Sequence, residues 1–226
     1  MSIIEWPSGI NPSEMSWRLI SNSKTFTSVF TGSSQTVRFP GSKWHCSLSF
    51  TNLTDDESRE LEALMASLDG ESGRVKISHW ARKGVANMGT PLVSASNQTG
   101  RYLQTKGWKP NTNVLRKGDY LTVNNELKMV TENIKSDVDG NAVIAISPML
   151  RYSPTLNEKV EVAKPYGIFK PVDNEQGDFQ FHPYLLSDVS LEFEEALYWW
   201  FTIPYLTKWL KPLMMIAIWL SLQSLI

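Results

Sequence analysis

The feature that most constrains the fold is a strict alternation of apolar and polar side chains in residues 43–50. The apolar residues on one side of this run are Trp44, Cys46, Leu48 and Phe50. Successive side chains of a β-strand point to opposite faces, so a period of two predicts a half-buried strand. We therefore expect a sheet with one apolar face.

The clearest helix follows this strand directly. Thr54 and Glu57 have the spacing of a capping box, and the two aspartates between them suit the positive end of a helix dipole. Four apolar residues then recur at helical spacing: Leu61, Leu64, Met65 and Leu68. Gly70 is the expected stop, and residues 74–79 resemble another strand. This order predicts a sheet with one helix packed against it.

Most of the remaining chain is also predicted to be β. Runs rich in β-branched and aromatic residues occur at 15–21, 25–30 and 36–40. In a second β-region, Asn124 and Asn125 join two apolar runs in the manner of a tight hairpin. Its short strands, with a closing strand expected at 159–163, are typical of a small β-barrel.

The predicted layout is discontinuous. We expect one domain to comprise residues 1–92 plus 165–196, completed by the alternating residues Val189, Leu191 and Phe193. Residues 93–164 form the inserted barrel in this scheme, and 197–226 are a hydrophobic C-terminal extension.

Composition excludes some partners and cross-links. The formal net charge of −1 gives no electrostatic reason to expect nucleic acid contact. Cys46 is the only cysteine, so no disulfide can form within the chain, which suits a reducing cytoplasm. Residues 1–10 lack the pattern of a signal peptide, and Cys46 is expected to be a small buried hydrophobe.

No catalytic, cofactor-binding or metal-binding residues are predicted, and we expect no enzyme. The histidines have no partner at zinc-motif spacing; they are His45, His79 and His182. The segment 137–141 resembles the start of a calcium loop, but Pro148 occupies the twelfth position, where a glutamate is needed. Three carboxylates alternate with apolar residues and are expected on the wet face of a strand: Glu192, Glu194 and Glu195.

The aromatic residues leave an alternative open. A sugar-binding surface could use Trp44, Trp80, Trp108, Tyr102 and Tyr120. Aromatic side chains belong more often to a core than to a ligand platform. A carbohydrate-binding module therefore stays a second hypothesis.

Several short motifs follow one another along the chain: Val-Arg-Phe-Pro-Gly-Ser-Lys-Trp (37–44), Leu-Asp-Gly-Glu-Ser-Gly-Arg (68–74), Gln-Thr-Gly (98–100), Gly-Trp (107–108), Val-Leu-Arg-Lys-Gly-Asp-Tyr (114–120), Ser-Asp-Val-Asp-Gly-Asn-Ala (136–142), Pro-Met-Leu-Arg (148–151) and Pro-Tyr-Gly (165–167). In this order they resemble the distal tail proteins of long-tailed bacteriophages and prophages of Gram-negative bacteria. The resemblance covers residues 30–196 and rests on order and spacing, because no single motif is diagnostic.

This resemblance implies a mainly β fold: a tail-tube-like β-sandwich with one flanking helix and an inserted small β-barrel. It also implies a structural protein of the virion tail tip, assembled in the bacterial host cytoplasm. Such proteins form a ring, expected to be hexameric, which joins the tail tube to the host-recognition hub. The implied partners are further copies of the chain and the tube and hub proteins.

The C-terminal segment departs from this pattern. Residues 198–226 are rich in tryptophan and contain only two charged side chains, Lys208 and Lys211. The segment could span a membrane, lie as an amphipathic helix at a membrane surface, or be read-through sequence beyond an ancestral stop. We favour read-through, because the composition changes where the family domain should finish. Weak membrane association, or a membrane-anchored protein, remains the alternative.

Overall fold

The structure is a computed structural model that describes residues 2–183 and 186–197. The extension 198–226 lies outside the described residues, so the expectations about it stay predictions. The described chain is mainly β with one α-helix and a curled, barrel-like part, as predicted for the fold class.

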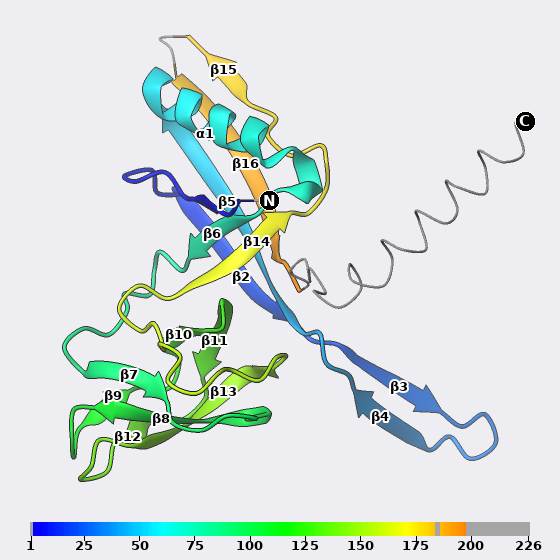
Figure 1. Ribbon diagram of the computed structural model, residues 1–226. Coiled ribbons are helices and arrows are strands. Elements are labelled where there is room, and N and C mark those ends of the chain that lie inside the picture. The colour runs from blue at the N-terminus through cyan, green and yellow to red at the C-terminus, as the bar shows by residue number, and fades with distance from the viewer. Residues whose placement is uncertain (1, 184–185, 198–226) are drawn as a thin grey trace, which may run out of the picture.

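The larger sheet contains strands from both ends of the described chain (Figure 1). Its members are β1 (Ile4–Glu5), β2 (Glu14–Ile20), β5 (Lys43–Leu53), β6 (Val75–Ser78), β14 (Tyr166–Pro171), β15 (Gln180–His182) and β16 (Leu186–Glu195). The order is β1-β6-β14-β16-β5-β2, and β15 pairs with one end of β16. The run 189–193 thus lies beside β5, more than a hundred residues away in sequence.

The predicted alternation sets the two faces of this sheet. Cross-strand rows place Met15 beside Leu48 and Leu48 beside Leu191, and a parallel row joins Trp17, Cys46 and Phe193. The residues of β5 and β16 in these rows are buried in the core, and Met15 and Trp17 pack against it. Side chains directly opposite each other on one face pack together, so the rows tie β2, β5 and β16 into one layer.

Helix α1 (Asp55–Leu68) covers part of the apolar face. Its capping box is confirmed: the Thr54 side chain accepts from the N–H of Glu57, and the Glu57 carboxylate accepts from the N–H of Thr54. Leu61, Leu64 and Leu68 are buried beneath it. The helix ends at Leu68 with Asp69 as its C-cap, and the expected stop, Gly70, follows with a φ of 63° and begins the short helix η1 (Gly70–Ser72).

The second sheet has the order β10-β11-β13-β8-β7. Its strands are β7 (Gly89–Val93), β8 (Gly100–Trp108), β10 (Tyr120–Val123), β11 (Glu126–Val130) and β13 (Ala142–Leu150). A small sheet of β9 (Asn113–Leu115) and β12 (Ile134–Lys135) accompanies it. The predicted hairpin is confirmed: Asn124 and Asn125 both have positive φ and join β10 to β11.

The closing strand expected at 159–163 was wrong. Only two isolated bridges form there, between Leu92 and Lys159 and between Thr122 and Glu161. The segment therefore crosses the open side of the barrel-like part without forming a continuous ladder, although Val162 still accepts a hydrogen bond from the N–H of Val85.

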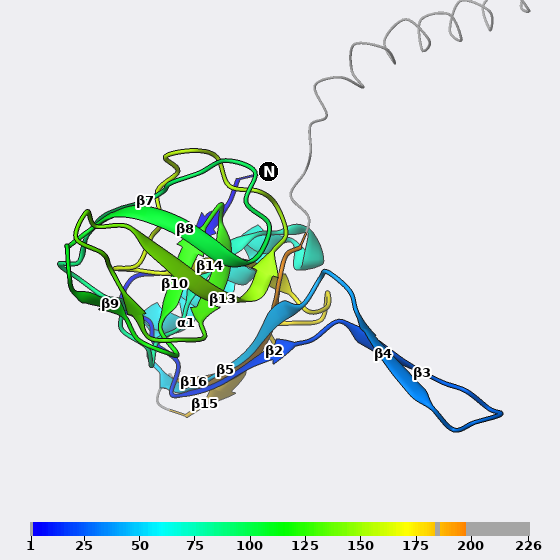
Figure 2. The same cartoon turned by 90° about the horizontal axis from the view of Figure 1, so that it is seen from below.

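The two sheets share a core where they meet. The Trp44 indole donates to the carbonyl of Leu127 at 3.0 Å, and Tyr120 and Leu127 pack in the core of the larger sheet. A third element stands apart from both. Strands β3 (Ser23–Thr27) and β4 (Ser34–Arg38) form a separate two-stranded sheet that projects from the body in both views (Figures 1 and 2).

Candidate assembly surface

The projecting hairpin, residues 23–38, is called the arm below. It is regular: β3 and β4 pair from Ser23 opposite Arg38 to Thr27 opposite Ser34, and the hydroxyls of Thr25 and Thr36 lie 2.8 Å apart. Its tip is closed by a hydrogen bond from the N–H of Ser28 to the carbonyl of Ser33. The ladder and the tip therefore satisfy much of the arm's backbone internally.

Within the described chain, the side chains of the arm have almost no cover. All five residues of β3 and four of the five in β4 are exposed. Near the tip Val29 is 91% exposed and Phe30 is 95% exposed, and on β3 Phe26 is 51% exposed. A two-stranded hairpin alone in water is at best marginally stable, and exposed apolar residues at its tip are of the kind often found at protein contacts.

The base of the arm is anchored to the body. The Asn22 side chain donates to the carbonyl of Pro40 at 2.7 Å, and the Asn22 carbonyl accepts from the N–H of Phe39 at 2.8 Å. Gly41 follows with a φ of 108°, a conformation that favours glycine. These contacts fix where the arm leaves the sheet.

Beside the arm, the larger sheet has an open edge. Strand β2 pairs with β5 on one side and is the last strand in the sheet order of the described chain. Along this seven-residue strand, alternate residues direct their backbone N–H and C=O groups to the free side, where another strand could pair with them. An edge of this length is a second place where a neighbouring chain can join.

The face of the sheet opposite the core is polar. Its cross-strand rows are Glu14, Ser49 and Ser190; Ser16, Ser47 and Glu192; and Arg18, His45 and Glu194. Within the described chain, the helix and the barrel-like part pack on the other face. A sheet with one apolar face inside and one polar face outside can line a wet channel.

Charged residues join the two sheets at the foot of the arm. Arg151, beyond the end of β13, forms hydrogen bonds at 2.8 and 2.6 Å with the two carboxylate oxygens of Glu195. It also donates to the carbonyl of Ser42 at 2.7 Å. Close by, the fully buried Lys128 ammonium lies 2.5 Å from the Glu126 carboxylate. This buried network fixes how the barrel-like part sits against the sheet.

The expectation for the three glutamates was wrong for Glu195. Its side chain is 2% exposed and points into the network with Arg151, because neighbours on a strand face opposite sides. Glu194 lies on the polar face. Partial burial opposes its ionisation, but hydrogen bonds from Lys43 and Lys170 outweigh it and lower the pKa of Glu194. No pattern near Glu195 in the sequence indicates that Arg151, 44 residues away, is its partner.

The histidines lie in three separate places. Burial and the charge of Arg18 lower the pKa of His45, whose ring is 3.6 Å from the Glu192 carboxylate. His79 packs against Trp17 and Tyr120, and burial lowers its pKa as well. His182 pairs with Asp188 at 3.0 Å on the surface.

The described residues contain no assembled site for metal or thiol chemistry. No group of three or more histidine, cysteine, aspartate or glutamate side chains gathers there. The Asp137 carboxylate accepts from the N–H groups of Asp139 and Asn141, and these bonds lower its pKa. Cys46 is buried, and burial raises the pKa of its thiol.

The five aromatic residues considered for a sugar surface are dispersed. Trp44 and Tyr120 lie in the shared core, and Trp108 is buried in the second sheet with its indole donating to Thr105. Tyr102 is the one of the five that is largely exposed, and Trp80 is partly buried near the N-terminal segment. These five residues therefore do not form one platform.

No helix among the described residues has the length and apolarity needed to cross a membrane. No known family model matches the chain, and no curated protein matches it.

Proposed function

We propose that this protein is a structural subunit that assembles with copies of itself into a ring, as a distal tail protein of a long-tailed phage or prophage. The observation that carries the proposal is the arm, a hairpin that leaves the body with exposed Val29 and Phe30 near its tip. The ordered motifs of the sequence supply the phage assignment, and the arm supplies a physical means of assembly.

The chemistry of the arm favours a protein neighbour as its cover. Burying an exposed valine or phenylalanine side chain contributes roughly 1.5–3 kcal/mol. Two such side chains near one tip therefore offer a useful part of a subunit contact. The arm reaches away from the body in both views, so its tip is placed for contact with another molecule.

The edge and the polar face are consistent with a closed ring. A cyclic assembly uses two different surfaces on each subunit, which meet head to tail and close by rotation. The arm and the adjoining free edge of β2 together supply one of these two surfaces. With the subunits arranged around an axis, the polar face of the larger sheet is suited to line a channel through which DNA passes without specific contact.

The proposed partners are the tail tube on one side and the tip hub on the other, in the virion and during assembly in the bacterial cytoplasm. Structural roles of this kind need no converging catalytic groups. The buried network of Arg151 and Glu195 suits such a role, because it holds the two sheets in one orientation.

Negative-stain microscopy and native mass measurement of the full-length protein test this proposal. We expect a six-fold ring with a central channel, either alone or after mixing with the tube and hub proteins of the same phage. A protein that stays monomeric at high concentration, and that also binds neither tube nor hub protein, would rule it out.

A further inference from the structure

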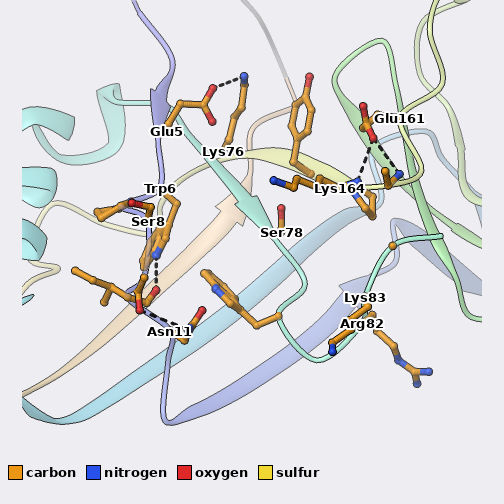
Figure 3. A pocket seen from close by; sticks show the side chains of 18 residues that line it. Glu5, Trp6, Ser8, Asn11, Lys76, Ser78, Arg82, Lys83, Glu161 and Lys164 are labelled. Atoms are coloured by element: carbon orange, nitrogen blue, oxygen red, sulfur yellow. Dashed lines mark hydrogen bonds and ion pairs between the residues drawn. The ribbon is translucent and has the colours of Figure 1, made fainter. Parts of the chain in front are cut away.

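A second surface lies away from the arm, where the chain crosses between the two sheets. It is a hollow of about 730 Å³, called the junction pocket below. In Figure 3, Glu5, Trp6, Ser8 and Asn11 lie on one side of it, with Arg82, Lys83, Glu161 and Lys164 on the other. Its size is within the usual range for small-molecule sites, which often form where two parts of a protein meet.

The walls of the junction pocket are held in place. The Trp6 indole donates to the carbonyl of Ile10 at 2.9 Å, and its ring stacks on Phe50 of the core. Trp80 meets Trp6 edge to face, with 5.2 Å between the ring centroids. Across the pocket, a Cβ on Gly84 would lie 2.1 Å from the carbonyl oxygen of Ala163, so the two crossing segments touch through their backbones.

The carboxylates of the junction pocket are already paired. Glu5 binds Lys76 at 2.5 Å. Glu161 binds Lys159 at 2.7 Å and also accepts from the N–H groups of Ala163 and Lys164. These hydrogen bonds, led by the one from Lys159, lower the pKa of Glu161, although partial burial opposes them. Both acids are therefore paired with groups of the protein itself.

Three cations of the junction pocket have no such partner. Arg82, Lys83 and Lys164 are exposed and make no ion pair or side-chain hydrogen bond with any residue in the described chain. They line the same hollow as the hydroxyls of Ser8 and Ser78 and the amide of Asn11. A pocket with unpaired positive charge, neutral hydrogen-bonding groups and indole walls fits a ligand that is anionic, rich in hydroxyls and partly apolar.

We propose that the junction pocket binds an acidic saccharide, a sugar chain whose rings carry carboxylate groups. Lys83 and Lys164 bind the carboxylates, the serine and asparagine side chains bind the ring hydroxyls, and Trp80 contacts an apolar ring face. This activity is separate from ring assembly and does not depend on it. The three cations line one side of a hollow, whereas a nucleic-acid surface usually carries a basic patch or stripe along one face.

Isothermal titration of the full-length protein with trigalacturonate, at low ionic strength, tests the proposal. Two matched ligands accompany it: the same trisaccharide with methyl-esterified carboxyls, and hexaglutamate. We expect trigalacturonate to bind, its affinity to fall as salt is added, and both matched ligands to bind more weakly. Absence of trigalacturonate binding overturns the proposal. Tighter binding of hexaglutamate than of trigalacturonate also overturns it, because the pocket would then favour acidic peptides.

Point variants test whether trigalacturonate binds in the junction pocket. Lys83→Gln and Lys164→Gln should each weaken trigalacturonate binding about tenfold, the effect of losing one charge-assisted hydrogen bond. Lys117→Gln changes an exposed lysine outside the pocket and should leave the affinity unchanged. Both pocket lysines are exposed, so the variants should fold. Equal affinities for all three variants and the wild type would contradict the assignment.

Discussion

At the scale of single residues, Arg151 and Glu195 have the clearest structural role. Their side chains are 9% and 2% exposed, and they join the segment after β13 to the end of β16. Glu195 also accepts from the backbone N–H of Trp44 at 3.2 Å. A buried ion pair contributes little net free energy compared with apolar packing, but removal of one partner leaves the other charge buried and uncompensated.

Replacement of Arg151 with methionine should lower the free energy of unfolding by roughly 3–5 kcal/mol, because Glu195 would lose its cation. Urea denaturation monitored by tryptophan fluorescence measures this change. Lys159→Met is the matched control, since Lys159 pairs with Glu161 at an exposed position and should cost at most about 1 kcal/mol. Equal losses in the two variants would show that the Arg151 network does not stabilise the fold.

Gly84 offers a second test at this scale. An alanine there would place its Cβ against the backbone of Val162 and Ala163, which cannot move as a flexible side chain would. We expect Gly84→Ala to lower the urea midpoint and to break the hydrogen bond from Val85 to Val162. Ser94→Ala is a suitable comparison outside that backbone contact. Hydrogen exchange at the Val85 amide should rise in the glycine variant alone.

At the scale of elements, the sequence predicted correctly those features that depend on interactions between residues close together in the chain. The capping box at Thr54 and Glu57 and the paired asparagines at 124 and 125 are short-range patterns, and both predicted the observed structure. The segment 159–163 failed for the opposite reason. Its backbone meets distant residues only at two isolated bridges and a few single hydrogen bonds, a pattern that its apolar alternation does not reveal.

The candidate surfaces and the buried ion pair likewise depend on contacts between distant parts of the chain. Burial of Glu195 follows from a partner 44 residues away, and the exposed position of the arm follows from the shape of the whole molecule. The sequence showed two β-rich runs at the arm but gave no sign that they would leave the core. The junction pocket combines three distant segments and was likewise not visible before the fold was known.

The capping box also predicts a pH effect. Hydrogen bonds from the backbone N–H and the hydroxyl of Thr54 lower the pKa of Glu57 below its usual 4.5. A carboxyl group with a lowered pKa in the folded state stabilises the fold above pH 4.5, and this contribution is lost as the pH falls through the lower, folded-state value.

In Glu57→Gln, the stability difference from the wild type should therefore be largest near neutral pH and should shrink as the solution is acidified. Thermal unfolding followed by circular dichroism across this pH range measures it. Glu60→Gln changes an exposed carboxylate later in the same helix and should show a smaller pH-dependent difference. A Glu57→Gln penalty that does not vary with pH would contradict the role of the charged cap.

At the scale of the whole molecule, three features are consistent with assembly: the arm, the free edge of β2 and the polar face of the larger sheet. The buried network below the arm holds the barrel-like part against that sheet, so the body can act as one unit. The arm is the feature on which the proposed ring depends most, because its apolar tip has no cover within the described chain.

The most direct test is the native mass of the full-length protein beside two double variants. Val29→Ser with Phe30→Ser removes the apolar side chains near the arm tip, whereas Val138→Ser with Val143→Ser removes two exposed valines from the barrel-like part. We predict closed rings for the wild type and the barrel variant, and folded monomers for the arm variant. Rings that persist in the arm variant, or a wild type that forms none even with tube and hub proteins, would contradict assembly through the arm.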